Sequence, residues 1–259
     1  MKPPDETPVP AGEQLVHESN AHRLTRIPKS IIVSESTPQN IDNKIVAFDY
    51  YNCFNYSLLA GDHENINLTV GITSPNPGEG KTLVASNLAV SLALGYERET
   101  VIVDLNVSKP RLHEVFGTPL VPGLLESMQN GSVHLSRTSI NHLSILSAGS
   151  ATGKGNGDRR SQSTLFHRAH REPAIGLKQL AAFRDVIHSL EQKYEFVIVD
   201  MPALHTRGFP ILYANELNGL LLVIDTRKTK RQDVEKVFRQ LHERQVLGFV
   251  FNRFVDEDS

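Results

Sequence analysis

The sequence predicts an α/β fold in which a mostly parallel sheet carries helices on both faces. Short, continuously apolar segments alternate with segments of helical periodicity along most of the chain. A loop rich in glycine and proline joins one apolar segment to the next helix, and two other apolar segments end in Asp104 and Asp200. Parallel α/β sheets bind ligands at the carboxyl ends of their strands, so these features predict a site at one edge of the sheet.

Composition limits the classes of protein that the chain can represent. The 259 residues, 39% hydrophobic and 22% charged, are enough for one well-buried core. A net charge of -2 makes nucleic acid an improbable partner by bulk charge. The single cysteine, Cys53, excludes an internal disulfide. We find neither an apolar run near the roughly 20 residues of a membrane span nor a signal-peptide core, so we expect a cytoplasmic protein.

Residues 1–42 differ from the rest of the chain. Six of the fourteen prolines fall within the first 38 residues, and the only apolar cluster is Ile31–Val33. Such a segment buries too little apolar surface to order itself, so we expect a mostly disordered, proline-rich leader. An ordered arm packed on the core is the alternative. Residues 43–259 are predicted to form a single domain.

The elements of that domain follow from apolar periodicity. The first helix has apolar residues at helical spacing, the strands are short apolar runs, and the later helices are amphipathic. Residues 148–176, rich in Gly, Ser and Arg, are predicted to be a long mobile loop. In chain order we expect a helix over Ile45–Leu59, a strand over Leu68–Ser74, a helix over Thr82–Leu94, strands over Thr100–Asp104 and Leu143–Ser147, a helix over Leu177–Lys193, strands over Phe196–Asp200 and Gly219–Asp225, a helix over Gln232–Arg244 and a strand over Leu247–Asn252.

The strongest local signal is the loop Ser74-Pro75-Asn76-Pro77-Gly78-Glu79-Gly80-Lys81-Thr82, which is typical of a nucleotide P-loop. Its glycines let successive backbone N–H groups turn toward phosphate oxygens, at the positive end of the following helix. Lys81 would neutralise the outer phosphates, and the Thr82 hydroxyl would ligate Mg²⁺. Pro75 occupies the first glycine position of the formal pattern, so a structural turn with a surface lysine is the alternative.

The two strand-end aspartates fit the same interpretation. Asp200 ends a Walker B-like strand and would hold Mg²⁺ through water, while Asp104 would approach the metal from the neighbouring strand. A helix cap or a loop contact is the alternative for either one.

These motifs together resemble the bacterial tyrosine kinases (BY-kinases) of capsule and exopolysaccharide export. The loop is similar to the family's Ser-x-x-Pro-Gly-Glu-Gly-Lys-[Ser/Thr], and Asp104 to His113, with Phe116-Gly117, is similar to its second Walker motif. Asp200-Met201-Pro202 and Gly248–Arg253 match the last two family motifs, and the resemblance covers roughly residues 45–255. It implies a P-loop NTPase of the deviant Walker, partitioning-ATPase-like type that uses ATP and Mg²⁺. The predicted site comprises nucleotide-binding residues Asn76, Pro77, Gly78, Glu79, Gly80, Lys81, Thr82, Leu83 and Asn252, metal-binding residues Thr82, Asp104 and Asp200, and catalytic residues Lys81 and Asp104.

Several family features are missing. Asn106 replaces the second acidic residue of the second Walker motif, and an amide cannot act as a base near neutral pH. Ser108 replaces an arginine, and the frame from Asp49 to Asn55 lacks both arginines of the family's ring-assembly helix, which predicts at most weak homo-oligomers. No tyrosine lies near the end of the sequence, and Tyr51 falls in an apolar helical frame that favours core packing.

Three functions therefore remain open. The first is a Mg-ATP-dependent protein-tyrosine (auto)kinase or ATPase, weakened by these losses. The second is a catalytically impaired nucleotide-binding regulator or scaffold, and the third, less favoured, is a partitioning ATPase. The resemblance implies a transmembrane polysaccharide co-polymerase as a separate partner, which would hold the protein at the inner face of the membrane.

Two basic segments allow further contacts. Residues 154–171 carry five cationic side chains against Asp158, a local charge of +4, which suits an anionic lipid, a polysaccharide or an acidic partner. A solvated loop is the alternative. Arg227–Arg231 is expected to lie near the nucleotide.

Overall fold

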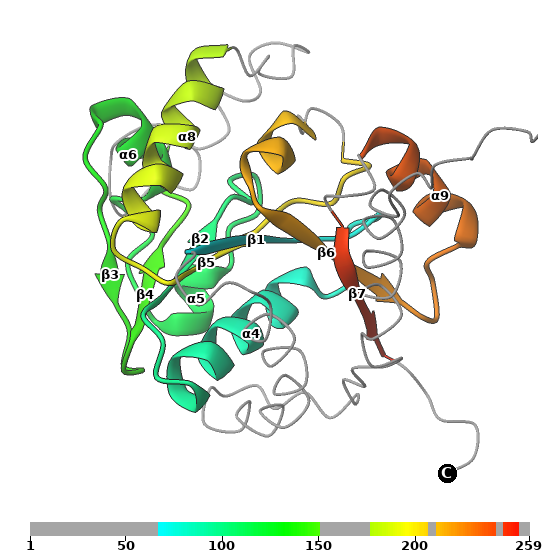
Figure 1. Cartoon of the computed structure of the whole chain (residues 1–259), viewed down its shortest axis with the longest axis horizontal. Coiled ribbons are helices and arrows are strands. Elements are labelled where there is room, and N and C mark those ends of the chain that lie inside the picture. The colour runs from blue at the N-terminus through cyan, green and yellow to red at the C-terminus, as the bar shows by residue number, and fades with distance from the viewer. Residues whose placement is uncertain (1–66, 151–176, 207–210, 242–245, 254–259) are drawn as a thin grey trace, which may run out of the picture.

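The fold is a seven-stranded sheet with helices on both faces, seen in a computed structural model that describes residues 67–150, 177–206, 211–241 and 246–253 (Figure 1). The strand order is β3-β4-β2-β5-β1-β6-β7. Every neighbouring pair is parallel except β3 and β4. The α/β prediction is therefore confirmed. The elements are β1 (Leu68–Thr73), α4 (Lys81–Gly95), β2 (Thr100–Asp104), α5 (Leu112–Phe116), α6 (Leu124–Asn130), β3 (Ser136–Arg137), β4 (Leu143–Leu146), α8 (Leu177–Glu191), β5 (Phe196–Asp200), the 3₁₀ helix η2 (Ile211–Glu216), β6 (Gly219–Asp225), α9 (Arg231–Gln240) and β7 (Val246–Asn252).

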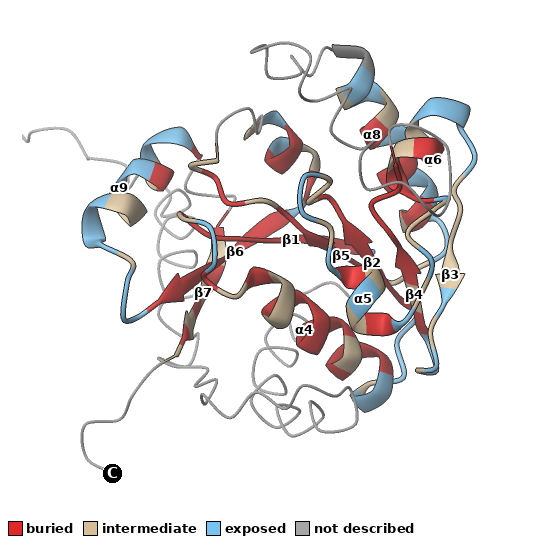
Figure 2. Ribbon diagram, turned by 180° about the vertical axis from the view of Figure 1, so that it is seen from behind, coloured by how far each residue is buried: buried red, intermediate tan, exposed pale blue. Residues whose placement is uncertain are grey.

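The central strands β2, β5, β1 and β6 are buried along their whole length, which explains their continuously apolar sequences. Figure 2 shows these strands as the buried centre of the molecule. One apolar cluster packs under α4 and α5, and includes Leu88 and Ile198. A second cluster lies on the opposite face, under α6, α8, η2 and α9, and includes Phe183 and Val199.

The register of the sheet brings the strand ends together. Asp104 of β2 lies opposite Asp200 of β5, and Ile72 of β1 lies opposite Asp200 on its other side. The loop of residues 74–80 follows β1 directly, so it starts beside both aspartates. The predicted meeting of the motifs at one edge of the sheet is therefore confirmed.

Some predicted boundaries were wrong, and some elements were missed. Helix α9 begins at Arg231 and ends at Gln240, because Leu241 has an extended backbone with φ -99° and ψ 148°. The short elements α5, α6, β3 and η2 escaped prediction, since two to seven residues are too few to show a period. The leader over residues 1–42, the helix over Ile45–Leu59 and the loop residues 151–176 lie outside the described residues, so those predictions stand as predictions.

No helix in the described ranges combines the length and apolar character that a membrane span requires.

Phe183 of α8 anchors the second cluster, and its removal should weaken the fold. The side chain is fully buried and meets the ring of Tyr213 edge to face at 4.7 Å. Truncation of a buried phenylalanine leaves a cavity and costs about 3–5 kcal/mol. We expect Phe183→Ala to lower the free energy of unfolding by that amount in urea denaturation. Leu212→Ala, at a side chain that is 47% exposed, should change it by less than about 0.5 kcal/mol. Equal effects of the two variants would contradict this account of the core.

Candidate functional site

The loop between β1 and α4 has the backbone of a phosphate cradle. Gly78 and Gly80 adopt φ values of 81° and 96°, which residues with a side chain rarely adopt. A Cβ at Gly80 would also lie 2.1 Å from Asn252 Nδ2. Pro75 is absent from the residues with positive φ, so a proline at the first glycine position of the formal pattern causes no conflict. The departure from the motif is therefore compatible with its geometry.

The side chain of Lys81, at the start of α4, reaches back to Ser74 at the start of the loop. Its side chain is buried at 8% exposure, and Nζ donates a hydrogen bond to Ser74 Oγ at 3.0 Å. Burial lowers the pKa of Lys81, while the charges of Asp200 and Glu79 oppose that shift. The alternative of a surface lysine on a structural turn is thus excluded. Among the described residues, the one hydrogen-bond partner of this buried ammonium is a neutral hydroxyl, so the ammonium is suited to an anionic ligand.

Thr82 and Asp200 are in direct contact at the first turn of α4. Thr82 Oγ1 donates to Asp200 Oδ2 at 2.6 Å. The other carboxylate oxygen, Asp200 Oδ1, is buried and has no hydrogen-bond partner among the described residues. An unpaired buried carboxylate oxygen beside a threonine hydroxyl is a donor set that fits Mg²⁺, which prefers oxygen ligands and usually binds phosphates at the same time.

Asp104 lies at the end of the neighbouring strand β2, and its carboxylate accepts hydrogen bonds from the segment that follows this strand. Oδ1 accepts the N–H of Asn106 at 3.0 Å, and Oδ2 accepts the N–H groups of Arg111 and Leu112 at 3.0 and 3.1 Å. These contacts match the alternative of a loop contact. They leave lone pairs on both oxygens, so a role for Asp104 toward a metal is still a prediction.

Burial raises the pKa of both aspartates, and the charge of Asp104 raises the pKa of Asp200 further. Burial raises the pKa of Asp104 to about 6, against three backbone N–H groups that lower it. Burial, followed by the charge of Asp104, raises the pKa of Asp200 to about 7, although Thr82 and Lys81 act in the opposite sense. A cation between them would favour the ionised forms. In the described residues no group of three or more His, Cys, Asp or Glu side chains could hold a metal ion, so a cation here would need oxygen ligands from Thr82 and a bound phosphate as well.

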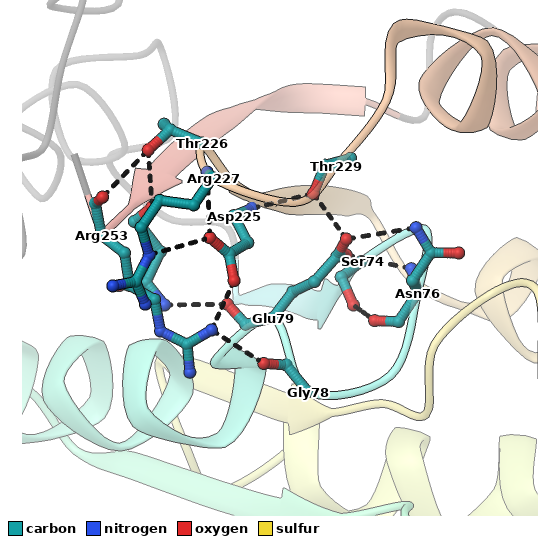
Figure 3. Close-up of polar contacts among 10 residues, drawn as sticks. Ser74, Asn76, Gly78, Glu79, Asp225, Thr226, Arg227, Thr229 and Arg253 are labelled. Carbon is teal, nitrogen blue, oxygen red and sulfur yellow. Dashed lines mark hydrogen bonds and ion pairs between the residues drawn. The ribbon is translucent and has the colours of Figure 1, made fainter. Parts of the chain in front are cut away.

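The outer side of the loop is held by residues from β6, β7 and the turn before α9 (Figure 3). The Glu79 carboxylate is buried at 2% exposure and accepts hydrogen bonds from Asn76 N at 3.0 Å and Thr229 Oγ1 at 2.5 Å. Asn252 Nδ2 donates to the Glu79 carbonyl at 2.8 Å. Predicted residues Glu79 and Asn252 are therefore at the site, but their side chains contact the loop itself.

Sequence reasoning missed an ionic contact behind the loop. The Asp225 side chain is fully buried and pairs with the guanidinium of Arg253, which also donates to the Gly78 carbonyl at 3.2 Å. Burial raises the pKa of Asp225, but the hydrogen bond from Arg253 and the N–H of Arg227 bring it below the usual range. The available signal was the position of Asp225 at the end of an apolar strand, the same pattern that singled out Asp104 and Asp200.

The other residues predicted to bind nucleotide lie in the loop and in the first turn of α4. Asn76 is half-buried in the loop, Pro77 is exposed at its tip, and Leu83 is half-buried in the first turn of α4. Ser108 is exposed. The basic segment Arg227–Arg231 follows Asp225 on the outer side of the loop, while the basic segment 154–171 and Tyr51 lie outside the described residues.

Sequence comparison finds relatives among bacterial tyrosine kinases, and no family model matches the chain. A putative tyrosine-protein kinase CapB of Staphylococcus aureus is 26% identical over 210 residues, covering 78% of this chain and 83% of CapB. Tyrosine-protein kinase CpsD of Streptococcus pneumoniae serotype 4 is 27% identical over 217 residues, with 80% and 84% coverage. The succinoglycan biosynthesis transport protein ExoP of Rhizobium meliloti is 25% identical over 201 residues, which cover 76% of this chain and 23% of ExoP.

Structure comparison agrees on the fold. The chimerical protein CapA2B2 superposes with a TM-score of 0.64 at 24% identity, over 84% of this chain and 92% of the other. The septum site-determining protein MinD of Pyrococcus horikoshii, in complex with Mg-ADP, superposes with a TM-score of 0.54 at 23% identity, over 74% of this chain and 72% of MinD. The chain is therefore a divergent relative of the bacterial tyrosine-protein kinases, built on the P-loop NTPase fold that they share with the MinD ATPases.

Proposed function

We propose that this protein binds Mg-ATP at the loop between β1 and α4. The observation that carries the proposal is the contact of Thr82 with Asp200, whose second oxygen is buried and unpaired within the described part of the chain, next to the buried ammonium of Lys81. Lys81 would neutralise the outer phosphates, and the N–H groups around Gly78 and Gly80 would line the cradle. Thr82 and Asp200, with Asp104 nearby, would hold Mg²⁺, which supplies positive charge for the transferred phosphoryl group when bound.

The activity that we propose is ATP-dependent phosphorylation of tyrosine, on the chain itself or a partner, or ATP hydrolysis. The relatives support it, since CapB and CpsD carry the names of tyrosine kinases. A second candidate is a nucleotide-dependent regulator or scaffold that transfers phosphate poorly. It is favoured by Asp104, whose oxygens already accept three backbone N–H groups, and by Asn106, which supplies no carboxylate.

The proposed partner is a transmembrane polysaccharide co-polymerase, with this protein held against the inner face of the membrane. Two comparisons support such a pairing. ExoP is a far longer transport protein of which this chain matches 23%, and CapA2B2 is a chimerical protein. A weak homo-oligomer is proposed for the free protein, because the helix frame from Asp49 to Asn55 has no arginine.

Lys81→Met tests the proposed function. Loss of a charged hydrogen bond to phosphate costs about 1.5–3 kcal/mol, so we expect Mg-ATP affinity to fall about 10- to 150-fold in calorimetry. The exposed Lys193 gives the matched control Lys193→Met, which should bind as the wild type does. Intact-mass analysis after incubation with Mg-ATP and a partner's cytoplasmic peptide then separates kinase from scaffold. No binding by the wild type would refute the proposal.

Asp200→Asn tests whether the buried Asp200 carboxylate destabilises the ligand-free protein. The folded protein keeps a proton on Asp200 up to a pKa of about 7, whereas the unfolded chain releases it near the ordinary 3.8. Between these values the unfolded state binds fewer protons, so ionisation removes stability as pH rises through the window, by at most about 4 kcal/mol. We expect Asp200→Asn, in EDTA, to be more stable than the wild type at pH 8 and closer to it at pH 5. A variant less stable than the wild type at pH 8 would contradict this balance.

A further inference from the structure

The strand β7 forms one edge of the sheet (Figure 1). Within the described residues it pairs with β6 alone. Its seven residues, Val-Leu-Gly-Phe-Val-Phe-Asn, include no charge and no proline. The opposite edge, β3, is only two residues long and contains Arg137. Long apolar edge strands pair with other strands and aggregate, so natural proteins shorten, charge or cover them. The edge at β3 is short and charged, whereas the edge at β7 needs a covering segment.

Aromatic side chains lie half-buried along this edge. Phe249 and Phe251 stack with ring centroids 6.4 Å apart, and Phe238 of α9 meets Phe249 at 5.9 Å. All three rings pack against the apolar cluster under α8 and α9 and remain partly exposed. Val250, between the two phenylalanines of β7, is buried in the cluster on the α4 side. The apolar surface that is left to cover is therefore on the α9 side of β7.

One stretch of the leader has the composition of a strand. The nine residues between Pro28 and Pro38 read Lys-Ser-Ile-Ile-Val-Ser-Glu-Ser-Thr, with residues 31–33 near the centre. Isoleucine and valine favour strands, while a proline cannot donate to a ladder of hydrogen bonds. The two prolines therefore limit strand pairing to residues 29–37, a length that suits the seven residues of β7.

The same residue pattern marks the central strands of the sheet. The sequence has three runs of three consecutive isoleucine or valine residues, at 31–33, 101–103 and 197–199. The second and third runs lie in β2 and β5, which are buried along their whole length. The first is the only such run in the ranges that the structure does not describe. It is therefore the best candidate in the chain for a further strand.

We propose that residues 29–37 of the same chain add a strand to the outer edge of β7. Strand addition gives the free backbone groups of an edge their hydrogen bonds, and alternate side chains supply the fit. Ile31 and Val33 share one face of such a strand, where they cover Phe249 and Phe251. Pairs of an aromatic and a β-branched residue on neighbouring strands are favourable. The ordered arm that the sequence leaves open is then this segment.

A segment of the same chain is favoured over a partner because it is already tethered. The roughly 30 residues between this stretch and Leu68 can extend to about 100 Å, so they reach β7 easily. A flexible tether gives an effective concentration on the order of millimolar, which a separate chain would have to match. Residues 254–259 follow β7 directly, and after a two-residue turn too few remain to cover the strand.

The added strand would also support the phosphate loop. Asn252, at the end of β7, donates to the Glu79 carbonyl, and Arg253 donates to the Gly78 carbonyl. A covered β7 therefore stabilises the strand that holds the outer side of the loop. Strand addition needs no nucleotide, so the proposal stands whether or not the protein binds Mg-ATP.

Hydrogen exchange by NMR tests the proposal in the full chain, at a concentration where sedimentation shows a monomer. The β7 amides that point away from β6 should exchange slowly in the wild type. Neighbouring residues in a strand direct their N–H groups to opposite edges, so Ile31→Pro or Ile32→Pro must remove a donor to β7. We expect at least one of them to speed exchange of the outer β7 amides by about tenfold or more. The matched control Ala21→Pro, in the leader outside the stretch, should exchange as the wild type does.

Side-chain contacts give a second measurement on the unaltered protein. Methyl groups of Ile31 or Val33 should show nuclear Overhauser effects to the ring of Phe249 or Phe251, and their absence overturns the proposal. Fast exchange of the outer β7 amides in the wild type also overturns it. Slow exchange that is equal in the wild type and both proline variants overturns it as well, because another segment then covers the edge. Protection that appears only in a dimer assigns the edge to a second copy and overturns the assignment to the same chain.

Discussion

The hydrogen bond between Glu79 and Thr229 is the constraint on which the rest of the site depends. It joins the phosphate loop to the turn between β6 and α9, at a carboxylate that is almost fully buried. A negative charge beside the proposed phosphate site would oppose binding, and the hydrogen bonds of Glu79 would offset that electrostatic cost. The same carboxylate accepts the Asn76 N–H, and the Glu79 carbonyl accepts Asn252. The loop is thereby held in one conformation before any ligand arrives, which would reduce the entropy lost if nucleotide binds as proposed.

On the inner side of the loop, by contrast, burial destabilises the charged side chains. Burial disfavours the charged forms of Lys81, Asp104 and Asp200 together, since it lowers the pKa of the lysine and raises the pKa of both carboxyls. Without a ligand these functional groups destabilise the fold, as is common where stability is exchanged for activity. A bound metal and phosphate would bring charges of both signs to the same place. The hydrogen bonds that stabilise the loop on its outer side and the buried charges that destabilise the inner side therefore belong to different residues.

The sequence predicted what depends on local pattern and failed where contact is between distant segments. Strands β2, β5 and β6 were predicted with their observed bounds, because buried parallel strands have a continuous apolar pattern. Lys81, Thr82 and Asp200 were predicted from spacing, and the structure brings them together. Arg253 was missed, since its partner Gly78 lies more than 100 residues away in sequence. Short elements such as α5 were missed because five residues show no period.

The choice between enzyme and scaffold depends on the second Walker loop. A scaffold gated by nucleotide needs only the cradle, the lysine and the metal ligands. An enzyme also needs a base for the attacking hydroxyl, and the amide of Asn106 cannot act as one near neutral pH. Asp104, at the start of that loop, already accepts three backbone N–H groups. Lone pairs remain on both of its oxygens, so these contacts alone do not make the protein inactive.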